Sequence, residues 1–150
     1  MKNVFLNVFS GITAALAIGL LGFAGETDPE FVFLMAPFGA TAVIVFGLPD
    51  SPLAQPQNVF FGHLLTALIG VIFVQYIGVG LVEMAIATGL GVTGMLMTKT
   101  THPPAGANPM LIMMTGQSWS FLLTPVVTGA LAIILVGMVA GKVRKVLLTD

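Results

Sequence analysis

The sequence predicts an all-α membrane protein with about six membrane segments, arranged as two inverted three-segment repeats with two discontinuous helices. Three observations predict this class. The chain has 150 residues, of which 57% are apolar and only 7% are charged, and its mean hydropathy is +1.05. The five long uncharged stretches contain 23, 19, 32, 15 and 42 residues, and four of them have room for a bilayer-spanning helix of roughly 20 residues. Prolines and glycines interrupt two of the segments.

The composition also excludes several classes of protein. A soluble domain carries roughly 25% charged residues, so these few charges cannot form its polar shell. A nucleic-acid-binding protein and a disordered chain are excluded on the same grounds. The absence of cysteine excludes disulfides and Cys–metal sites. We expect no metal, no cofactor and no enzyme, because no nucleophile–base pair, metal-ligand spacing or cofactor motif is present. Residues 1–150 are expected to form a single domain.

The first helix is predicted over residues 4–24. Lys2 precedes the apolar run, as in a signal peptide. The run is longer than an h-region of roughly 7–15 residues, and no clear cleavage site follows. We therefore expect a retained helix.

The second segment is predicted over residues 29–48. Asp28 is the expected N-cap and Pro29 the first helical residue. Pro37 and Gly39 are expected to break this segment, because proline removes a helical hydrogen bond. Residues 49–58 follow as a proline-rich loop, in which the polar side chains more plausibly order the loop than bind a substrate.

The remaining segments are predicted over residues 59–79, 80–98 and 120–142. Between the last two lies a proline-rich stretch, residues 99–109, that cannot form a regular helix. The apolar stretch 110–115 is too short to cross a bilayer alone. These two stretches together are expected to make one discontinuous segment.

The basic residues predict the orientation. Lys2 lies at one end of the chain, and Lys142, Arg144 and Lys145 lie at the other. The positive-inside rule places both termini in the cytoplasm. An even number of crossings is then required, and the irregular fifth segment must count as one. The expected location is a bacterial inner membrane, as a multi-pass protein.

A weak internal repeat relates residues of about 1–78 to residues of about 79–146. At an offset of 67 residues, five pairs of glycines align, including Gly39 with Gly106, and Thr41 aligns with Asn108. About one glycine pair is expected by chance. Three segments per unit is an odd number, so the second unit is expected to be inverted, with the broken segments meeting near the midplane. The alternative is that apolar, glycine-rich helices simply resemble one another.

The broken segments predict a binding cradle for an anion. Non-helical backbone at membrane depth must lie inside the protein, so residues 36–41 and 101–108 are expected there. A half-helix N-terminus presents N–H donors and the positive end of a dipole. Asn108 and Pro109 resemble a cap and a first helical residue. The predicted cradle comprises Phe38, Gly39, Ala40, Thr41, Ala105, Gly106, Ala107 and Asn108, with Thr41 and Asn108 as side-chain donors.

Three further side chains are candidates for a gate or an electrostatic role. His102 is expected to act as a polar or protonatable gate, and the alternative is a neutral ring that caps the turn. His63 is a second candidate, for which interfacial packing is the stronger interpretation. Lys99 either attracts an entering anion or snorkels to the interface.

These residues resemble the HPP family of integral membrane proteins. The resemblance rests on THPPAGANP at residues 101–109, APFGAT at 36–41, and SPLAQPQNV at 51–59 followed by Gly62-His63-Leu64. It implies a compact multi-helix membrane domain and, in cyanobacterial and plastid members, nitrite transport. The expected function is a transporter or channel for a small monovalent anion, with nitrite first. A transporter of another small solute and a non-transporting scaffold remain open. Glycine-rich helix faces favour a homo-oligomer.

Overall fold

The computed structural model describes residues 2–27 and 34–149, which are helical and contain no strand. Within them lie six α-helices: α1 (Lys2–Thr27), α2 (Pro37–Ala42), α3 (Pro56–Ile72), α4 (Leu81–Met97), α5 (Asn108–Thr115) and α6 (Thr128–Thr149). Short π-helices extend α2 (η1, Val43–Gly47) and α3 (η3, Phe73–Ile77) and precede α6 (η5, Leu122–Val127). Two 3₁₀ turns lie in the connections: η2 (Pro52–Ala54) and η4 (Pro103–Ala107).

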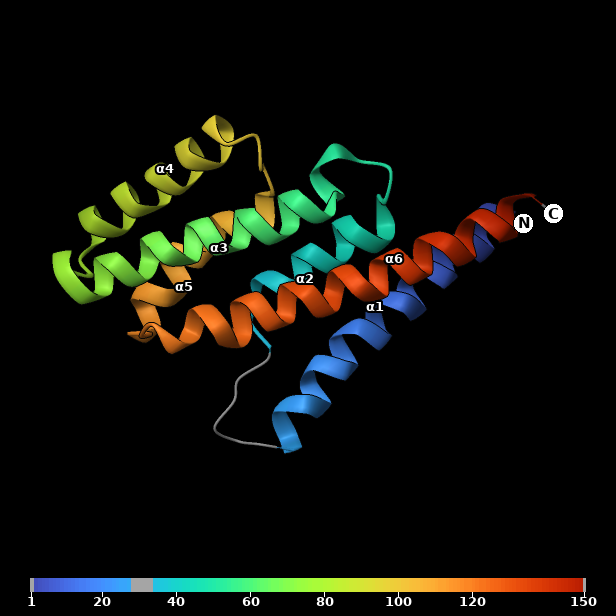
Figure 1. Ribbon diagram of the computed structural model, residues 1–150, viewed down its shortest axis with the longest axis horizontal. Coiled ribbons are helices and arrows are strands. Elements are labelled where there is room, and N and C mark those ends of the chain that lie inside the picture. Colours follow the sequence, from blue (N-terminus) through green and yellow to red (C-terminus); the bar gives the residue numbers. More distant parts are fainter. Residues whose placement is uncertain (1, 28–33, 150) are drawn as a thin grey trace.

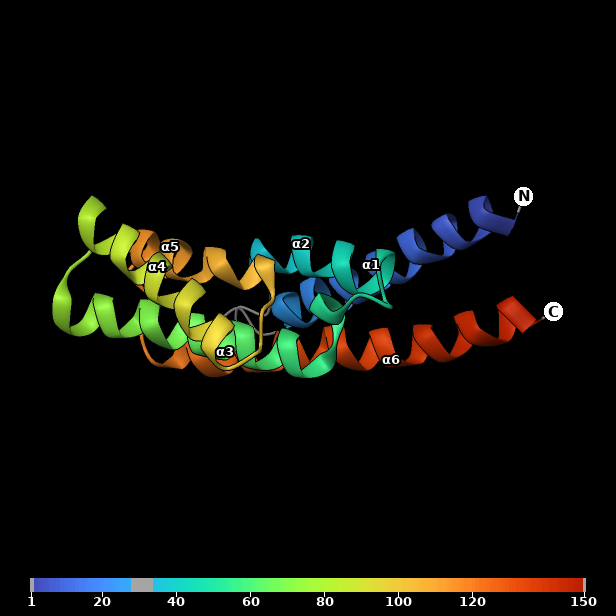
Figure 2. The ribbon, with the colours of Figure 1, turned by 90° about the horizontal axis from the view of Figure 1, so that it is seen from above.

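Three of the helical stretches are long and apolar enough to cross a bilayer: Val4–Glu26, Pro56–Ile77 and Leu122–Leu148. Helix α4 has 17 residues and is slightly shorter. Helices α1 and α6 lie side by side, and both chain ends lie at the same end of the molecule (Figures 1 and 2). Helix α3 packs against α4, α5 and α6. The multi-pass helical architecture predicted from hydropathy is therefore present.

The two short helices α2 and α5 run in opposite directions along the molecule. Both begin near its middle, and α2 runs toward the end that holds the termini while α5 runs away from it (Figures 1 and 2). Helix α2 contacts the turn η4 that leads into α5. The chain therefore returns to the interior twice, after α1 and after α4, and starts a short helix there each time.

The beginning of α2 differs from the prediction. Residues 34–36 are not helical, and the helix starts at Pro37. Proline is suited to this first position because its missing N–H would have no helical partner. Gly39 lies within the helix, so the expected non-helical stretch 36–41 is wrong from residue 37 onward. The predicted cap Asp28 and first helical residue Pro29 lie outside the described residues.

Other helix boundaries also differ from the prediction. Helix α3 begins at Pro56 rather than at 59, again with proline at the first position. Asn108 is itself helical, with φ −61° and ψ −46°, and its side chain caps nothing, so the predicted cap role is wrong. The last helix reaches Thr149 and is kinked where Thr124, at φ −130° and ψ 116°, precedes Pro125.

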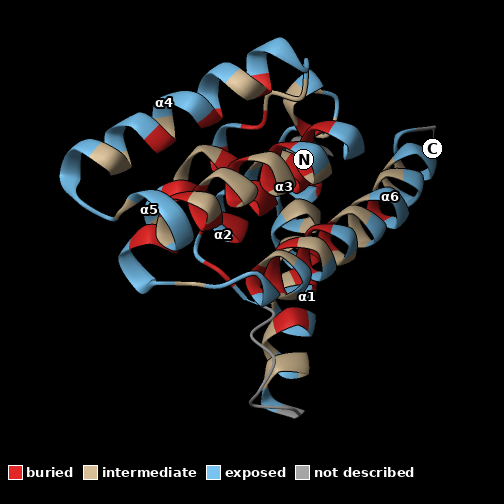
Figure 3. Ribbon diagram, turned by 60° about the vertical axis from the view of Figure 1, so that its left-hand side comes forward, coloured by how far each residue is buried: buried red, intermediate tan, exposed pale blue. Residues whose placement is uncertain are grey.

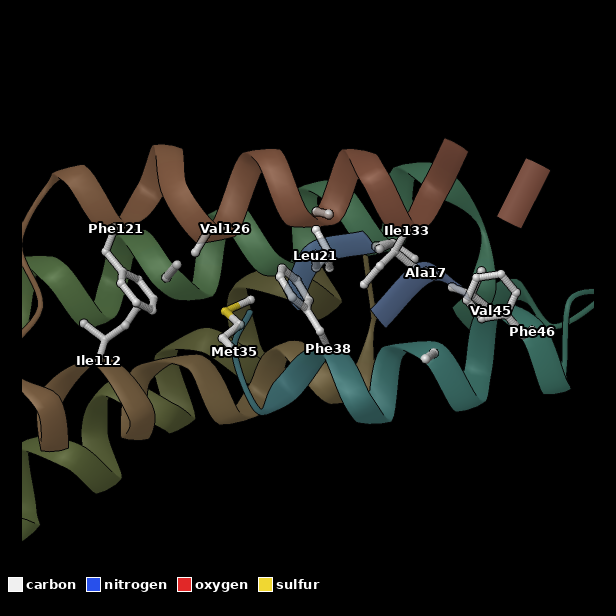
Figure 4. Close-up of a cluster of buried hydrophobic side chains, with 14 of the residues drawn as sticks. Ala17, Leu21, Met35, Phe38, Val45, Phe46, Ile112, Phe121, Val126 and Ile133 are labelled. Atoms are coloured by element: carbon white, nitrogen blue, oxygen red, sulfur yellow. The ribbon is translucent and has the colours of Figure 1, made fainter. Parts of the chain in front are cut away.

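Buried apolar side chains join α1, α2, α3, α5 and α6 into one core. Phe38 projects from α2 toward Leu21 of α1 (Figure 4). Glycine allows close contact between helices, because a Cβ on Gly70 would lie 3.0 Å from the Cα of Pro109. The outer faces of α1 and α4 are exposed (Figure 3), and they carry large apolar side chains such as Leu20 and Leu81. Such surfaces are suited to contact with lipid.

Candidate functional site

Four polar side chains from four parts of the chain meet inside the helical core. They are Thr41 of α2, His63 of α3, His102 just before η4, and Asn108 of α5, and each exposes 0% of its surface. Polar groups in a membrane interior are expensive and mark functional sites unless they are paired. The pairing within this cluster therefore decides what the site can do.

The Thr41 hydroxyl connects the two imidazole rings. Its Oγ1 lies 2.8 Å from Nε2 of His63 and 3.0 Å from Nε2 of His102. The same oxygen lies 3.1 Å from the carbonyl oxygen of Pro37, one turn earlier in α2. The ring centroids of the two histidines are 5.1 Å apart. One hydroxyl on one short helix thus joins histidines from two other elements.

The carbonyl of Leu53 determines which nitrogen of each neutral histidine carries hydrogen. His102 Nδ1 lies 2.8 Å from the Leu53 carbonyl oxygen, which only accepts, so Nδ1 is the donor. In a neutral ring, Nε2 of His102 then accepts the hydrogen of Thr41. The Thr41 oxygen in turn accepts from Nε2–H of His63. When the hydroxyl hydrogen of Thr41 lies toward His102 rather than toward its other acceptor, the Pro37 carbonyl, all donors along this chain point toward Leu53.

Asn108 completes the chain at its other end. Its Nδ2 lies 3.0 Å from Nδ1 of His63, 3.1 Å from the His63 carbonyl oxygen and 3.0 Å from Oγ1 of Thr66. Thr66 donates to the Gly62 carbonyl at 2.8 Å. Asn108 Oδ1 is buried and has no hydrogen-bond partner. The N–H groups of Asn108 are therefore fully used, and its free atom is an acceptor.

The histidines are held in place by the backbone around them. A Cβ on Gly62 would lie 3.0 Å from both the His102 Cβ and the Thr100 carbonyl oxygen, so only glycine allows this approach. Asn58 donates to the Thr101 carbonyl at 3.0 Å, which ties the start of α3 to the loop before His102. Asn58 therefore orders the loop before His102, whereas the prediction concerned its own loop, residues 49–58. The Phe38 ring covers His63 edge-on, with centroids 5.2 Å apart.

The structure separates the predicted site residues into groups. Thr41, His63, His102 and Asn108 lie together, and Phe38 and Ala105 are buried. Gly106 and Ala107 are half-buried, whereas Gly39, Ala40 and Lys99 are exposed. Three of the predicted backbone donors already have partners: the amides of Phe38, Gly39 and Ala105 donate to Met35, Ala36 and His102 at 3.0, 3.1 and 3.0 Å. An anion at these amides would have to replace those carbonyls.

Sequence reasoning missed two members of the site. Thr66 lies three residues after His63 on the same face of α3 and contacts Asn108. The spacing of three residues after His63 could have identified Thr66 as a neighbour of the site. Nothing in the sequence identifies the carbonyl of Leu53 as part of the site, because every residue has a carbonyl and only the fold brings this one to His102.

No described cavity opens onto these four side chains. One cavity, of about 470 Å³, lies at the end that holds the termini and is lined by Asp50, Lys142 and Arg144 among others. The described residues also hold no group of three or more His, Asp or Glu side chains placed to bind a metal. The cluster is closed in this structure, so access to it requires a conformational change.

Comparisons with known proteins identify relatives of the whole membrane domain. The chain matches the family described as "HPP, transmembrane region" over residues 1–146. It is 36% identical over 149 residues to one transmembrane protein of Dictyostelium discoideum and 34% identical over 144 residues to another. These alignments cover 94% and 91% of this chain but 47% and 50% of the relatives, so the chain spans about half of their length. No solved structure matches it.

Proposed function

This chain belongs to the HPP transmembrane family and is an integral membrane protein, and from this premise we propose that it is a transporter or channel for a small monovalent anion, with nitrite as the first candidate. The nitrite assignment rests on the resemblance to cyanobacterial and plastid members. The curated relatives are described only as transmembrane proteins. The substrate class rests on the site.

One observation carries the proposal: the polar cluster lies where two short helices begin near the middle of a membrane bundle. Broken helices whose N-termini meet at the midplane are a recurring way to hold a solute in transporters, because the dipole ends there are positive. The described residues of α2, η4 and α5 carry no acidic side chain that would repel an anion.

The anion would be bound after the cluster opens. The Thr41 hydroxyl and the Asn108 amide, now bonded to His63, would exchange that ring for an oxygen of the anion. The first amides of α2 and of the η4–α5 segment would add donors as their turn carbonyls move away. Lys99, exposed at the start of the loop after α4, would raise the local positive potential.

We also propose an inverted repeat for the architecture. The order long helix, short helix, long helix occurs twice, as α1–α2–α3 and α4–α5–α6, and α2 and α5 run in opposite directions. The three basic residues of α6 lie at the end that holds both termini, which favours a cytoplasmic location for that end. Gly11 and Gly19 of α1 have open space where a Cβ would lie, which favours a homo-oligomer.

Two alternatives each have an observation in their favour. The unpartnered Asn108 Oδ1 favours a solute that donates a hydrogen bond, such as a neutral molecule. The closed cluster, with every other buried side-chain polar atom paired among the described residues, favours a scaffold without transport.

Nitrite uptake into proteoliposomes tests the proposal. The double variant Thr41→Val with Asn108→Leu should lower the initial rate of uptake to that of empty vesicles. Thr13→Val is the matched control, because Thr13 is also buried but bonds only within α1. Full uptake by the double variant would remove this site from the pathway. Folded protein with no flux of any small anion, and no thermal shift with nitrite, would favour the scaffold.

A further inference from the structure

We propose that His102, Thr41 and His63 form a proton relay, so that the proton is a second substrate moved together with the anion. This inference rests on the transport function proposed above and adds the co-substrate. It is carried by the geometry of the closed cluster, in which one hydroxyl lies between two imidazole nitrogens within hydrogen-bond distance of both.

The relay has a defined direction. From Asn108 to Leu53 the successive distances are 3.0, 2.8, 3.0 and 2.8 Å, so no link exceeds 3.0 Å. Each group along it donates to the next: the Asn108 amide to His63, His63 to Thr41, Thr41 to His102, and His102 to Leu53. A chain in which every member both accepts and donates can pass a proton without moving its heavy atoms.

The transfer balances at every atom. A proton arriving at Nδ1 of His63 forms an N–H bond there, and the Nε2–H bond of the same ring breaks. The released hydrogen forms a covalent O–H bond with the Thr41 oxygen. The hydrogen that Thr41 already carried moves to Nε2 of His102. The Leu53 carbonyl cannot itself take up a proton, so the Nδ1–H bond of His102 breaks only once the cluster opens, and a water molecule on the Leu53 side accepts the proton as hydronium. One proton enters, one leaves, and no electron is transferred.

The Asn108 side chain can respond to the arriving proton. Its Nδ2 faces the bare Nδ1 of His63, while Oδ1 has no partner. Once Nδ1 carries hydrogen it becomes a donor, and rotation of the amide brings Oδ1 to accept from it. Asn108 Oδ1, which has no partner while Nδ1 of His63 is bare, thus becomes the acceptor when Nδ1 is protonated. The protonated form of the anion supplies the proton to Nδ1 of His63 before the anion replaces this ring as the partner of Thr41 and Asn108.

The helical elements that carry the groups of the relay, α2, η2, α3 and α5, contain no titratable side chain other than His63, and neither does η4. Helices α1 and α6 also pack against α2 or α3, and their charged residues are Lys2, Glu26, Lys142, Arg144 and Lys145. Glu83 lies in the first turn of α4, near the opposite end of that helix from the loop that leads to His102, and Lys99 is exposed in that loop. Both rings are fully buried, so in the closed cluster neither exchanges protons directly with solvent.

The two ends of the relay differ in depth. His102 bonds to Leu53 in the η2 turn, whose neighbour Pro52 is exposed and where Leu53 itself is half-buried. His63 lies within α3, covered by Phe38. The alternative bond from Thr41 to the Pro37 carbonyl gives the hydroxyl a position in which the relay is interrupted. Resetting the relay between cycles requires each ring to change the nitrogen that carries hydrogen, for example by ring rotation, in addition to rotation of this hydroxyl.

The first experiment measures nitrite and protons together. Proteoliposomes holding a pH-sensitive dye receive external nitrite, and initial rates are corrected with empty vesicles for leakage of nitrous acid. With an outward-acidic gradient we expect uptake several-fold faster than at equal pH, with matching internal acidification. Thr41→Ser should keep this stimulation, Thr41→Val should lose it, and Thr13→Val should behave as the unmodified protein.

The outcomes separate the two proposals. Nitrite uptake that ignores the pH gradient would overturn the relay and leave the transport function standing. Stimulation that survives in Thr41→Val would also overturn the relay. Absence of nitrite uptake by the folded protein would overturn both.

The second experiment needs no transport. The chain contains two histidines, so ¹⁵N-histidine labelling reports on these two rings alone. At neutral pH we expect hydrogen on Nε2 of His63 and on Nδ1 of His102, assigned with His63→Gln and His102→Gln. The same neutral tautomer on both rings, or hydrogen on Nε2 of His102, would contradict the relay.

Discussion

Thr41 and Asn108 bind the two nitrogens of the same imidazole. The Thr41 hydroxyl lies 2.8 Å from Nε2 of His63, and the Asn108 amide nitrogen lies 3.0 Å from Nδ1. These residues align when the sequence is compared with itself at an offset of 67 residues. A histidine of α3 thereby ties the two short helices to each other, so substitutions at this histidine or its partners should lower the stability of the protein.

Removing the central ring should destabilise the protein. His63→Leu leaves Thr41 Oγ1 without its donor and two buried amide hydrogens with fewer acceptors. Each unsatisfied buried group costs about 1–3 kcal/mol. We expect a clearly lower melting temperature in detergent. Leu64→Ala, on the half-buried face of the same helix, is the comparison, and an equal loss in both variants would mean that the cluster contributes no special stability.

Thr66→Val tests the link that sequence reasoning missed. The substitution keeps the shape of the side chain but removes the hydroxyl that accepts from Asn108. A loss of about 1 kcal/mol is expected. Thr88→Val serves as control, because Thr88 bonds only to Met84 within α4. Unfolding monitored by tryptophan fluorescence should show the difference, and identical curves would contradict it.

Gly62→Ala should displace the loop that carries His102. The added methyl group would lie 3.0 Å from the Thr100 carbonyl oxygen, which is backbone and has little freedom to move. Overpacking of this kind costs about 1–3 kcal/mol. Gly89→Ala in α4 meets nothing within 4 Å and should be neutral or slightly stabilising. The prediction fails if thermal unfolding shows both variants equally stable.

Gly70→Ala should separate α3 from α5. Its Cβ would lie 3.0 Å from the Cα of Pro109 and 3.1 Å from the Cβ of Ile112. We expect a loss of about 1–3 kcal/mol, with weaker nitrite uptake because Asn108 moves with Pro109. Gly89→Ala has open space around it and is the control. Undisturbed melting and uptake would show that α5 tolerates the shift.

Substitutions at Lys99 distinguish its two interpretations. Lys99 adopts φ 57°, a left-handed conformation that favours glycine. Lys99→Gly should therefore raise stability by up to about 1 kcal/mol. If the charge attracts the anion, Lys99→Gly and Lys99→Gln should both slow uptake, and more strongly at low salt. Unchanged uptake in both would leave Lys99 as a residue of the interface alone.

Much of the architecture was predictable because hydropathy acts locally. Gaps between charges located α1, α3 and α6, and the prolines marked the connections that leave and re-enter the bundle. The same local signal could not place the start of α2, because proline is compatible with both a broken helix and a first helical residue. Asn108 was misjudged for a similar reason, since asparagine before proline caps many helices but here bonds to another helix.

The sequence by itself determined the membrane class, the number of long helices and the residue types available for a polar site, since these depend on composition and on spacing along the chain. Tertiary structure decided which of those residues meet. Thr41 is separated from His63 by 22 positions and from His102 by 61, and Asn108 is separated from His63 by 45. Hydrogen bonds act over about 3 Å, so their partners and direction exist only once α2, α3 and α5 pack together.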